Sequence, residues 1–223
     1  MAYRSVIETD VGSVHIVCTD RSDGDFNVAN PASDIDDRRS ALVDRPWTWL
    51  RQVHSADVVS VTRPGEFSGH EADGLVTRVP GCPLSVTTAD CSPVVLVANN
   101  GVSVVHAGWR GALTGIIDEA ATRLLSNGST PVAAFVGPTI SSAKYEFGLA
   151  ELTPFVDRFG ADVVGETTDG SPALDMAKVV ELACARFGFR ASPPLACTSD
   201  QNRFSHRIRK ESERQATLAW IDG

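Results

Sequence analysis

Two short stretches constrain the fold most strongly, because each is apolar on both alternations of an extended strand. These stretches are Val94–Val97 and Val102–Val105. A strand that is hydrophobic on both faces is covered on both faces, as in layered α/β folds. Since the link Asn99-Asn100-Gly101 is short enough for a hairpin turn, we expect the two strands to run antiparallel. The sequence therefore predicts an α/β fold (α+β in some classifications) with a mixed sheet.

Two further segments show the 3.6-residue period of amphipathic helices. The first ends at Asn127-Gly128, and its apolar face carries Leu113, Ile116, Ile117, Ala120, Ala121 and Leu124. The second follows Asp175, a suitable N-cap, ends before Gly188, and carries Met176, Val179, Val180, Ala183, Cys184 and Phe187 on its apolar face. With no internal repeat and no low-complexity linker, we expect residues 1–223 to form one domain.

The remaining elements are expected from β-rich runs and turn signals. Strands are predicted at Ser13–Cys18, Trp47–Val53, Val58–Thr62, Leu84–Thr88, Pro93–Ala98, Val132–Val136 and Thr217–Ile221, besides the strand at Val102–Val105. The polar stretch 19–39 is expected to form a surface loop that leads into a short helix at Ile35–Val43.

Charge and cysteine content exclude several classes of protein. A formal net charge of -8 disfavours broad binding to nucleic acid or to an anionic membrane. The N-terminus lacks the apolar core of a signal peptide, and no stretch approaches the roughly 20 apolar residues of a membrane span. The five cysteines show no disulfide spacing, so they are expected to be thiols of a cytoplasmic protein.

Cysteine and histidine side chains gather at the ends of the predicted strands. His54 follows one strand, Cys91 lies two residues before the strand that begins at Pro93, and His106 ends the next strand. A hairpin places the start of one strand beside the end of its neighbour. We therefore expect Cys91 and His106 to lie within reach of each other.

A thiolate beside an imidazole supports two chemistries, and the residues alone leave both open. Cys91 could be a nucleophile with His106 as its general base. The pair could instead belong to a metal site that His54 completes. Three protein ligands with an open fourth position are typical of a catalytic zinc, which activates water. A purely structural role for each residue is the third alternative.

Six motifs follow one another along the chain. They are Arg51-Gln52-Val53-His54, Ala72-Asp73-Gly74-Leu75-Val76-Thr77, Thr88-Ala89-Asp90-Cys91-Ser92-Pro93, His106-Ala107-Gly108-Trp109-Arg110-Gly111, Gly137-Pro138-Thr139-Ile140 with Tyr145-Glu146, and Cys197-Thr198 with Phe204-Ser205. Together they resemble the motifs of the YfiH/YlmD family, also called laccase-domain or "polyphenol oxidase" proteins and, more recently, multifunctional purine nucleoside enzymes. The resemblance extends from about Ser13 to Ile221.

The resemblance implies a zinc ion held by His54, Cys91 and His106. It implies phosphorolysis of adenosine, inosine, guanosine and methylthioadenosine, and deamination of adenosine, so the expected partners are purine nucleosides and phosphate. It also implies a three-layer α/β/α fold with a mixed sheet, related to the catalytic domain of the cytotoxic necrotizing factor deamidases. Those deamidases use a Cys–His pair without metal, which keeps a metal-free hydrolase as the alternative. Copper is discounted, because multicopper oxidases use many more imidazoles than the five histidines here provide.

Other side chains are candidates for binding the substrate. Arg110, at the predicted start of a helix, is expected to hold phosphate and to act in catalysis, unless it closes the helix with an ion pair. Asp73 is expected to act as an acid, to support a ligating histidine or to form a turn. Tyr145 and Glu146 are expected to stack on and hydrogen-bond a base, and His206 is expected to line the pocket.

Two segments depart from the family pattern. His206 stands where the family often has tyrosine, followed by a single Arg207 in place of a pair of arginines. The acidic stretch Asp20–Asp25 stands where the family has a glycine-rich loop. Both segments are expected near the pocket mouth, where they bear on substrate preference.

Overall fold

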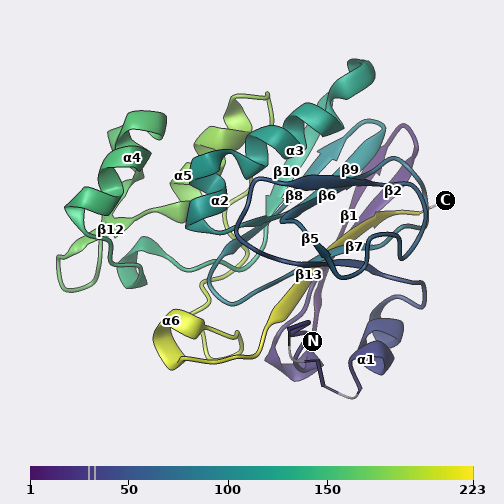
Figure 1. Cartoon of the computed structure of the whole chain (residues 1–223), viewed down its shortest axis with the longest axis horizontal. Coiled ribbons are helices and arrows are strands. Elements are labelled where there is room, and N and C mark those ends of the chain that lie inside the picture. The colour runs from purple at the N-terminus through teal and green to yellow at the C-terminus, as the bar shows by residue number, and fades with distance from the viewer. Residues whose placement is uncertain (30, 33, 223) are drawn as a thin grey trace.

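The computed structural model describes residues 1–29, 31–32 and 34–222, and its core is formed by two large sheets packed face to face (Figure 1). Positions 30 and 33 of the expected loop, and position 223 of the expected domain, lie outside the described residues. The strand order is β10-β8-β9-β6-β4 in one sheet and β1-β2-β13-β7-β3-β5 in the other, and β11 pairs with β12 in a small third sheet. Both large sheets contain parallel and antiparallel pairs. The predicted mixed α/β class is therefore confirmed.

The elements have the following bounds. The strands are β1 (Tyr3–Thr9), β2 (Gly12–Cys18), β3 (Thr48–Arg51), β4 (Val58–Val61), β5 (His70–Glu71), β6 (Gly74–Thr77), β7 (Leu84–Thr88), β8 (Ser92–Ala98), β9 (Gly101–Ala107), β10 (Pro131–Val136), β11 (Val164–Glu166), β12 (Pro172–Leu174) and β13 (Gln215–Ile221). The helices are α1 (Ile35–Leu42), α2 (Trp109–Thr114), α3 (Ile116–Leu124), α4 (Leu149–Phe159), α5 (Met176–Ala185) and α6 (His206–Arg209).

The hairpin of β8 and β9 lies at the centre of the fold. The two strands pair antiparallel, with Pro93 opposite His106, and every residue of both is buried. One face of their sheet packs against helices α2 to α5, and the other face packs against the six-stranded sheet. Figure 1 shows α1 on the side of the molecule opposite α3. Coverage of both strand faces explains why these sequences are apolar on both alternations.

The helices agree with the sequence in part. The segment expected as one helix around Leu113–Leu124 is two helices, because Gly115 adopts a left-handed conformation with φ of 103° between α2 and α3. Helix α5 begins as predicted, since the Asp175 carboxylate accepts the backbone N–H of Lys178 at 3.0 Å. Helix α4, with Pro154 inside it, was not expected. Across the described ranges, none of the helices combines the length and the hydropathy that crossing a bilayer requires.

Candidate metal and substrate site

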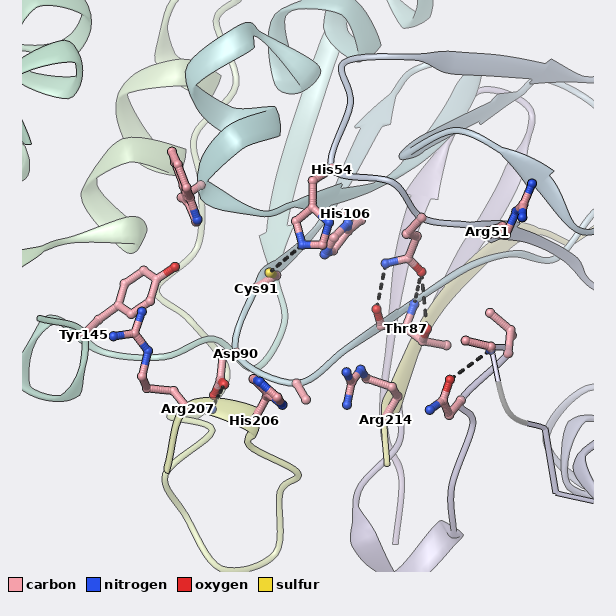
Figure 2. Close-up of a pocket in the computed structure, with 16 residues that line it drawn as sticks. Arg51, His54, Thr87, Asp90, Cys91, His106, Tyr145, His206, Arg207 and Arg214 are labelled. Atoms are coloured by element: carbon pink, nitrogen blue, oxygen red, sulfur yellow. Dashed lines mark hydrogen bonds between the residues drawn. The ribbon is translucent and has the colours of Figure 1, made fainter. Parts of the chain in front are cut away.

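Three side chains that are distant in the sequence meet at one end of the central hairpin. His54 follows β3, Cys91 precedes β8 and His106 lies near the end of β9. One donor atom from each lies within 4.8 Å of the other two. Sγ of Cys91 is 3.9 Å from Nε2 of His54, and Figure 2 shows the three side chains converging. The hairpin thus brings Cys91 and His106 together in the way that its register predicts.

A buried carboxylate holds this group from behind. Asp73 lies fully buried before β6 and accepts hydrogen bonds from the backbone N–H groups of Val53, His54 and Ser55, at 2.7–3.2 Å. These bonds stabilise the left-handed conformation of His54, whose φ is 61°. The loop after β3 therefore points the His54 ring toward the other two donors.

The same carboxylate orients the second imidazole. Oδ1 of Asp73 lies 2.7 Å from Nδ1 of His106. Burial alone would raise the pKa of Asp73, but hydrogen bonds from His106 and Ser55 outweigh burial and lower it. An ionised carboxylate only accepts hydrogen bonds, so Nδ1 of His106 carries the proton and Nε2 is left to face the other donors. Asp73 thus has the geometry of a residue that supports a ligating histidine.

The Cys91–His106 pair has strongly shifted pKa values. Burial alone would raise the pKa of the Cys91 thiol, but the charge of His106 and hydrogen bonds to both imidazoles lower it to about 6. Burial alone would lower the pKa of His106, but the charge of Cys91 and the hydrogen bond to Asp73 raise it to about 9. A thiolate beside a protonated imidazole is therefore favoured at neutral pH when no metal is bound.

The three donors fit a metal ion. A tetrahedral zinc with ordinary Zn–S and Zn–N bonds separates its ligand atoms by roughly 3.3–3.6 Å. The donors here lie within 4.8 Å of one another, so a small contraction would bring them to that spacing. Gly108 makes their approach feasible, because a Cβ at this position would lie 2.6 Å from Cδ2 of His54 and 3.2 Å from Sγ of Cys91. His54, Cys91 and His106 could hold a metal ion, and their donor set suits zinc.

The donors open into a cavity of about 420 Å³, which is within the range of small-molecule sites. Its lining consists of Asn27, Val28, Ala29, Arg51, Gln52, His54, Thr87, Ala89, Asp90, Cys91, His106, Trp109, Tyr145, His206, Arg207 and Arg214. In Figure 2, His206, Arg207 and Arg214 lie on the opposite side of the cavity from His54 and His106.

Comparison with known families accounts for almost the whole chain. Residues 16–222 match the family model described as "Multi-copper polyphenol oxidoreductase laccase". The chain belongs to this laccase-like family, which includes YfiH.

Relatives within the laccase-like family carry names that refer to nucleosides. The chain is 36% identical over 189 residues to a purine nucleoside phosphorylase of Xylella fastidiosa, covering 78% of this chain and 71% of that protein. It is 32% identical over 183 residues to a purine nucleoside phosphorylase of Mycobacterium tuberculosis, covering 78% and 72%.

Solved structures of similar proteins share the fold. A Neisseria meningitidis protein matches with a TM-score of 0.83 at 23% identity, covering 99% of both chains. The YfiH protein of Bacillus licheniformis matches with a TM-score of 0.81 at 22% identity, covering 94% of this chain and 93% of that one. The resemblance to the laccase-like family and the mixed α/β fold class are therefore confirmed.

Some of the expected substrate-binding residues line the cavity, and others lie outside its described lining. Tyr145 and His206 line the cavity. Burial and the nearby Cys91 raise the pKa of Tyr145, so its hydroxyl stays protonated. Arg110 is exposed, stacks on Trp109 at 4.1 Å and is absent from the cavity lining within the described residues. Glu146 is also exposed and outside the described lining.

Several lining residues were not expected from the sequence. Arg207 and Arg214 contribute guanidinium groups, and Asp90 contributes a carboxylate. Asp90 lies inside a family motif directly before Cys91, and Arg207 follows His206 in a segment already expected at the pocket mouth. These two positions in the sequence could have identified Asp90 and Arg207 as lining residues. Arg214 carried no local signal, because only the tertiary fold brings the start of β13 beside the loop after β2.

Proposed function

We propose that this protein is a zinc-dependent purine nucleoside phosphorylase, with zinc held by His54, Cys91 and His106. One observation carries the proposal: three metal-ligating donor atoms within 4.8 Å of one another open into a cavity of about 420 Å³. The names of relatives at 30–36% identity support it. The proposed substrates are adenosine, inosine, guanosine and methylthioadenosine, with deamination of adenosine as a second reaction. The cytoplasm is the proposed location.

Each candidate ligand contributes a defined donor to the ion. Cys91 offers a thiolate, and His106 offers Nε2 because its Nδ1 is bonded to Asp73. When bound, zinc would act as a Lewis acid and lower the pKa of a coordinated water toward neutrality. A site with two histidines and one cysteine also binds copper(II) well, so the metal content of the protein as purified is part of the test.

Phosphorolysis requires charge stabilisation at two points. A phosphate oxygen attacks C1′ of the ribose, the bond from C1′ to the base nitrogen breaks, and its electron pair leaves with the base. The proton of the phosphate monoanion or dianion ends on the departing purine, which gives free base and ribose 1-phosphate. The guanidinium groups of Arg207 and Arg214 attract the phosphate. The protonated hydroxyl of Tyr145 is a donor for the departing base.

A metal-free Cys–His hydrolase is the second candidate, because one observation favours it. Cys91, His106 and Asp73 form a thiolate, imidazole and carboxylate series in which the carboxylate orients the imidazole. That arrangement also activates a cysteine nucleophile toward an amide. The metal requirement separates the two candidates.

The proposal is tested with the purified protein, its metal content and a panel of the four nucleosides with and without phosphate. We expect about one zinc per chain, and chromatography should show free base and ribose 1-phosphate only when phosphate is present. Inosine should form from adenosine without phosphate. Full turnover of an amide by metal-free protein, with no release of base, would assign the cysteine hydrolase instead. Oxygen consumption with a phenol would assign a copper oxidase.

A further inference from the structure

Three arginines line the cavity, and two of them have no carboxylate partner among the described residues. Arg51 pairs with Glu71 at 2.6 Å. Arg207 and Arg214, by contrast, form no ion pair with a carboxylate in the part of the chain that the structure describes. Guanidinium groups that line a cavity without a counter-ion are suited to an anionic ligand.

Arg207 and Arg214 differ in how many of their guanidinium N–H groups are free of hydrogen bonds within the protein. Nη1 of Arg214 donates to three carbonyls of its own loop, those of residues 211, 212 and 213, at 2.8–3.2 Å. The guanidinium of Arg207 lies over the ring of Tyr145 at 4.8 Å and makes no hydrogen bond within the described residues. Arg207 therefore keeps the planar fork of donors that matches a phosphate.

The backbone of Arg207, rather than its guanidinium, is held by a carboxylate. Oδ2 of Asp90 accepts the N–H of Arg207 at 2.6 Å. Oδ1 accepts the hydroxyl protons of Thr198 and Ser205 at 2.7 Å and 2.6 Å. Asp90 is only 7% exposed. Its carboxylate thus fixes the loop that carries Arg207 and leaves the positive charge of the side chain open to the cavity.

Asp90 also belongs to the turn that carries Cys91. Its φ is 106°, a conformation that L residues rarely adopt. Its carbonyl accepts the N–H of Ile140 and the hydroxyl of Thr139, at 3.0 Å and 3.1 Å. Asp90 is therefore hydrogen-bonded to the loop of Arg207 and is also the residue directly before Cys91, a candidate metal ligand. Strain held in place by several hydrogen bonds is typical of functional sites.

We propose that Arg207 is the phosphate-binding group of the cavity and that Asp90 is its positioning residue. The inference rests on the proposed phosphorolysis and names the subsite that phosphate occupies. Asp90 sets where the guanidinium stands relative to Cys91, so that bound phosphate lies close to the reacting nucleoside. Such alignment of two reactants lowers the entropic part of the barrier.

The test compares variants by their KM for inorganic phosphate. Arg207→Gln should raise this KM about ten- to hundredfold, the loss expected for charge-assisted hydrogen bonds. Arg214→Gln should raise it much less, because Nη1 of Arg214 is already bonded. Asp90→Gly removes the three hydrogen bonds that the Asp90 carboxylate accepts. Because glycine readily adopts a positive φ, the backbone turn is kept. This variant should raise the phosphate KM at least tenfold, with the nucleoside KM within about threefold of the wild-type value.

Two measurements separate positioning from support of the fold. Zinc content should stay near wild type in Asp90→Gly even though the loss of three hydrogen bonds to a buried carboxylate lowers the thermal midpoint. Asp90→Asn, which retains one acceptor oxygen, should recover part of the phosphate affinity. Asp175→Asn is the matched control, because Asp175 also accepts a backbone N–H but lies at α5 outside the described cavity lining. It should leave the phosphate KM unchanged.

The outcomes distinguish this inference from the proposed function. Wild-type turnover that needs phosphate, with a phosphate KM unchanged in Arg207→Gln or raised more in Arg214→Gln, overturns the inference and leaves the function intact. Losses of zinc and of nucleoside affinity in Asp90→Gly as large as the loss of phosphate affinity show a structural role and also overturn it. Absence of phosphate-dependent turnover in the wild type refutes the function itself. In that case, calorimetric titration with inorganic phosphate tests the inference separately: weaker phosphate binding by Arg207→Gln than by the wild type supports it, and equal binding overturns it.

Discussion

The carboxylate of Asp73 lies 2.7 Å from Nδ1 of His106 and also accepts the backbone N–H of His54 at 3.0 Å. One buried group therefore sets the position of two candidate ligands, one in the loop after β3 and one on β9. A metal site assembled in this way depends on the carboxylate as much as on the ligands themselves.

Replacing Asp73 with Asn should therefore damage both stability and metal binding. The amide group would face N–H donors with its own N–H₂, and His106 would lose its ionised partner. We expect the free energy of unfolding to fall by about 3–5 kcal/mol. Zinc affinity should fall about ten- to hundredfold. Thermal unfolding and competition with a chromogenic chelator measure the two effects.

Ser55→Ala is the matched control for that variant. It removes the Ser55 hydroxyl from Asp73, a bond of 3.0 Å, but keeps the carboxylate and its bond to His106. Zinc affinity should stay within about threefold of the wild-type value. An equal loss of zinc in both variants would show that Asp73 acts through loop stability rather than through the imidazole.

The central hairpin was predictable because it depends on local patterns, and the closeness of Cys91 and His106 follows from the hairpin. Apolar residues on both alternations and a short polar link fixed β8 and β9, and the register then put Cys91 beside His106. The break at Gly115 was missed, because an apolar period continues across a glycine whose left-handed conformation the pattern does not register.

The cationic side of the cavity was harder to predict, because long-range contacts build it. Asp25 accepts the backbone N–H of Arg214 at 2.8 Å across most of the chain length, and no sequence period encodes such a contact. Arg110 was expected at the site from its position at a helix start. Its guanidinium is exposed and stacks at 4.1 Å on Trp109, which itself lines the cavity, so the role of Arg110 stays a prediction.

Gly108 offers a test of how closely the ligands must approach. Its φ of -70° suits any residue, so Gly108→Ala changes the available space and leaves the backbone unstrained. The new Cβ would lie 2.6 Å from Cδ2 of His54 and would push the ring away. We expect zinc affinity to fall at least tenfold while stability falls by about 1–3 kcal/mol. Equilibrium dialysis against buffered zinc measures the affinity.

Gly160→Ala controls for a general loss of stability. No atom lies within 4 Å of the Cβ that it adds, but its φ of 90° strains an alanine. It should destabilise the fold by about 1 kcal/mol or more without changing zinc affinity. Normal zinc binding in Gly108→Ala would contradict the close approach of the ligands that the structure describes.

The thiols should differ sharply in reactivity once metal is removed with a chelator. The pKa of Cys91 is lowered to about 6, whereas burial raises the pKa of Cys18 and Cys184 to about 12. Because the thiolate is the reactive form, alkylation of Cys91 should rise with pH through about 6 and level off above pH 7. Cys18 and Cys184 should stay unlabelled in the folded protein. Peptide mass spectrometry after iodoacetamide treatment measures each site, and labelling of Cys91 that begins only above pH 8 would contradict the prediction.

Cys91→Ser separates the two enzymatic hypotheses most directly. If Cys91 is a zinc ligand, a neutral hydroxyl is a poor replacement, and the two imidazoles alone form a weaker site. Zinc occupancy and nucleoside turnover should then fall together. If Cys91 is the nucleophile of an amidase, Ser should leave the metal content unchanged, and an electrophile should trap the native thiol as a covalent adduct. We expect loss of both metal and activity, measured by elemental analysis and by chromatography of the reaction products. Full zinc retention with abolished activity would instead assign the cysteine hydrolase, because the thiol would then be needed for the chemistry and not for holding the ion.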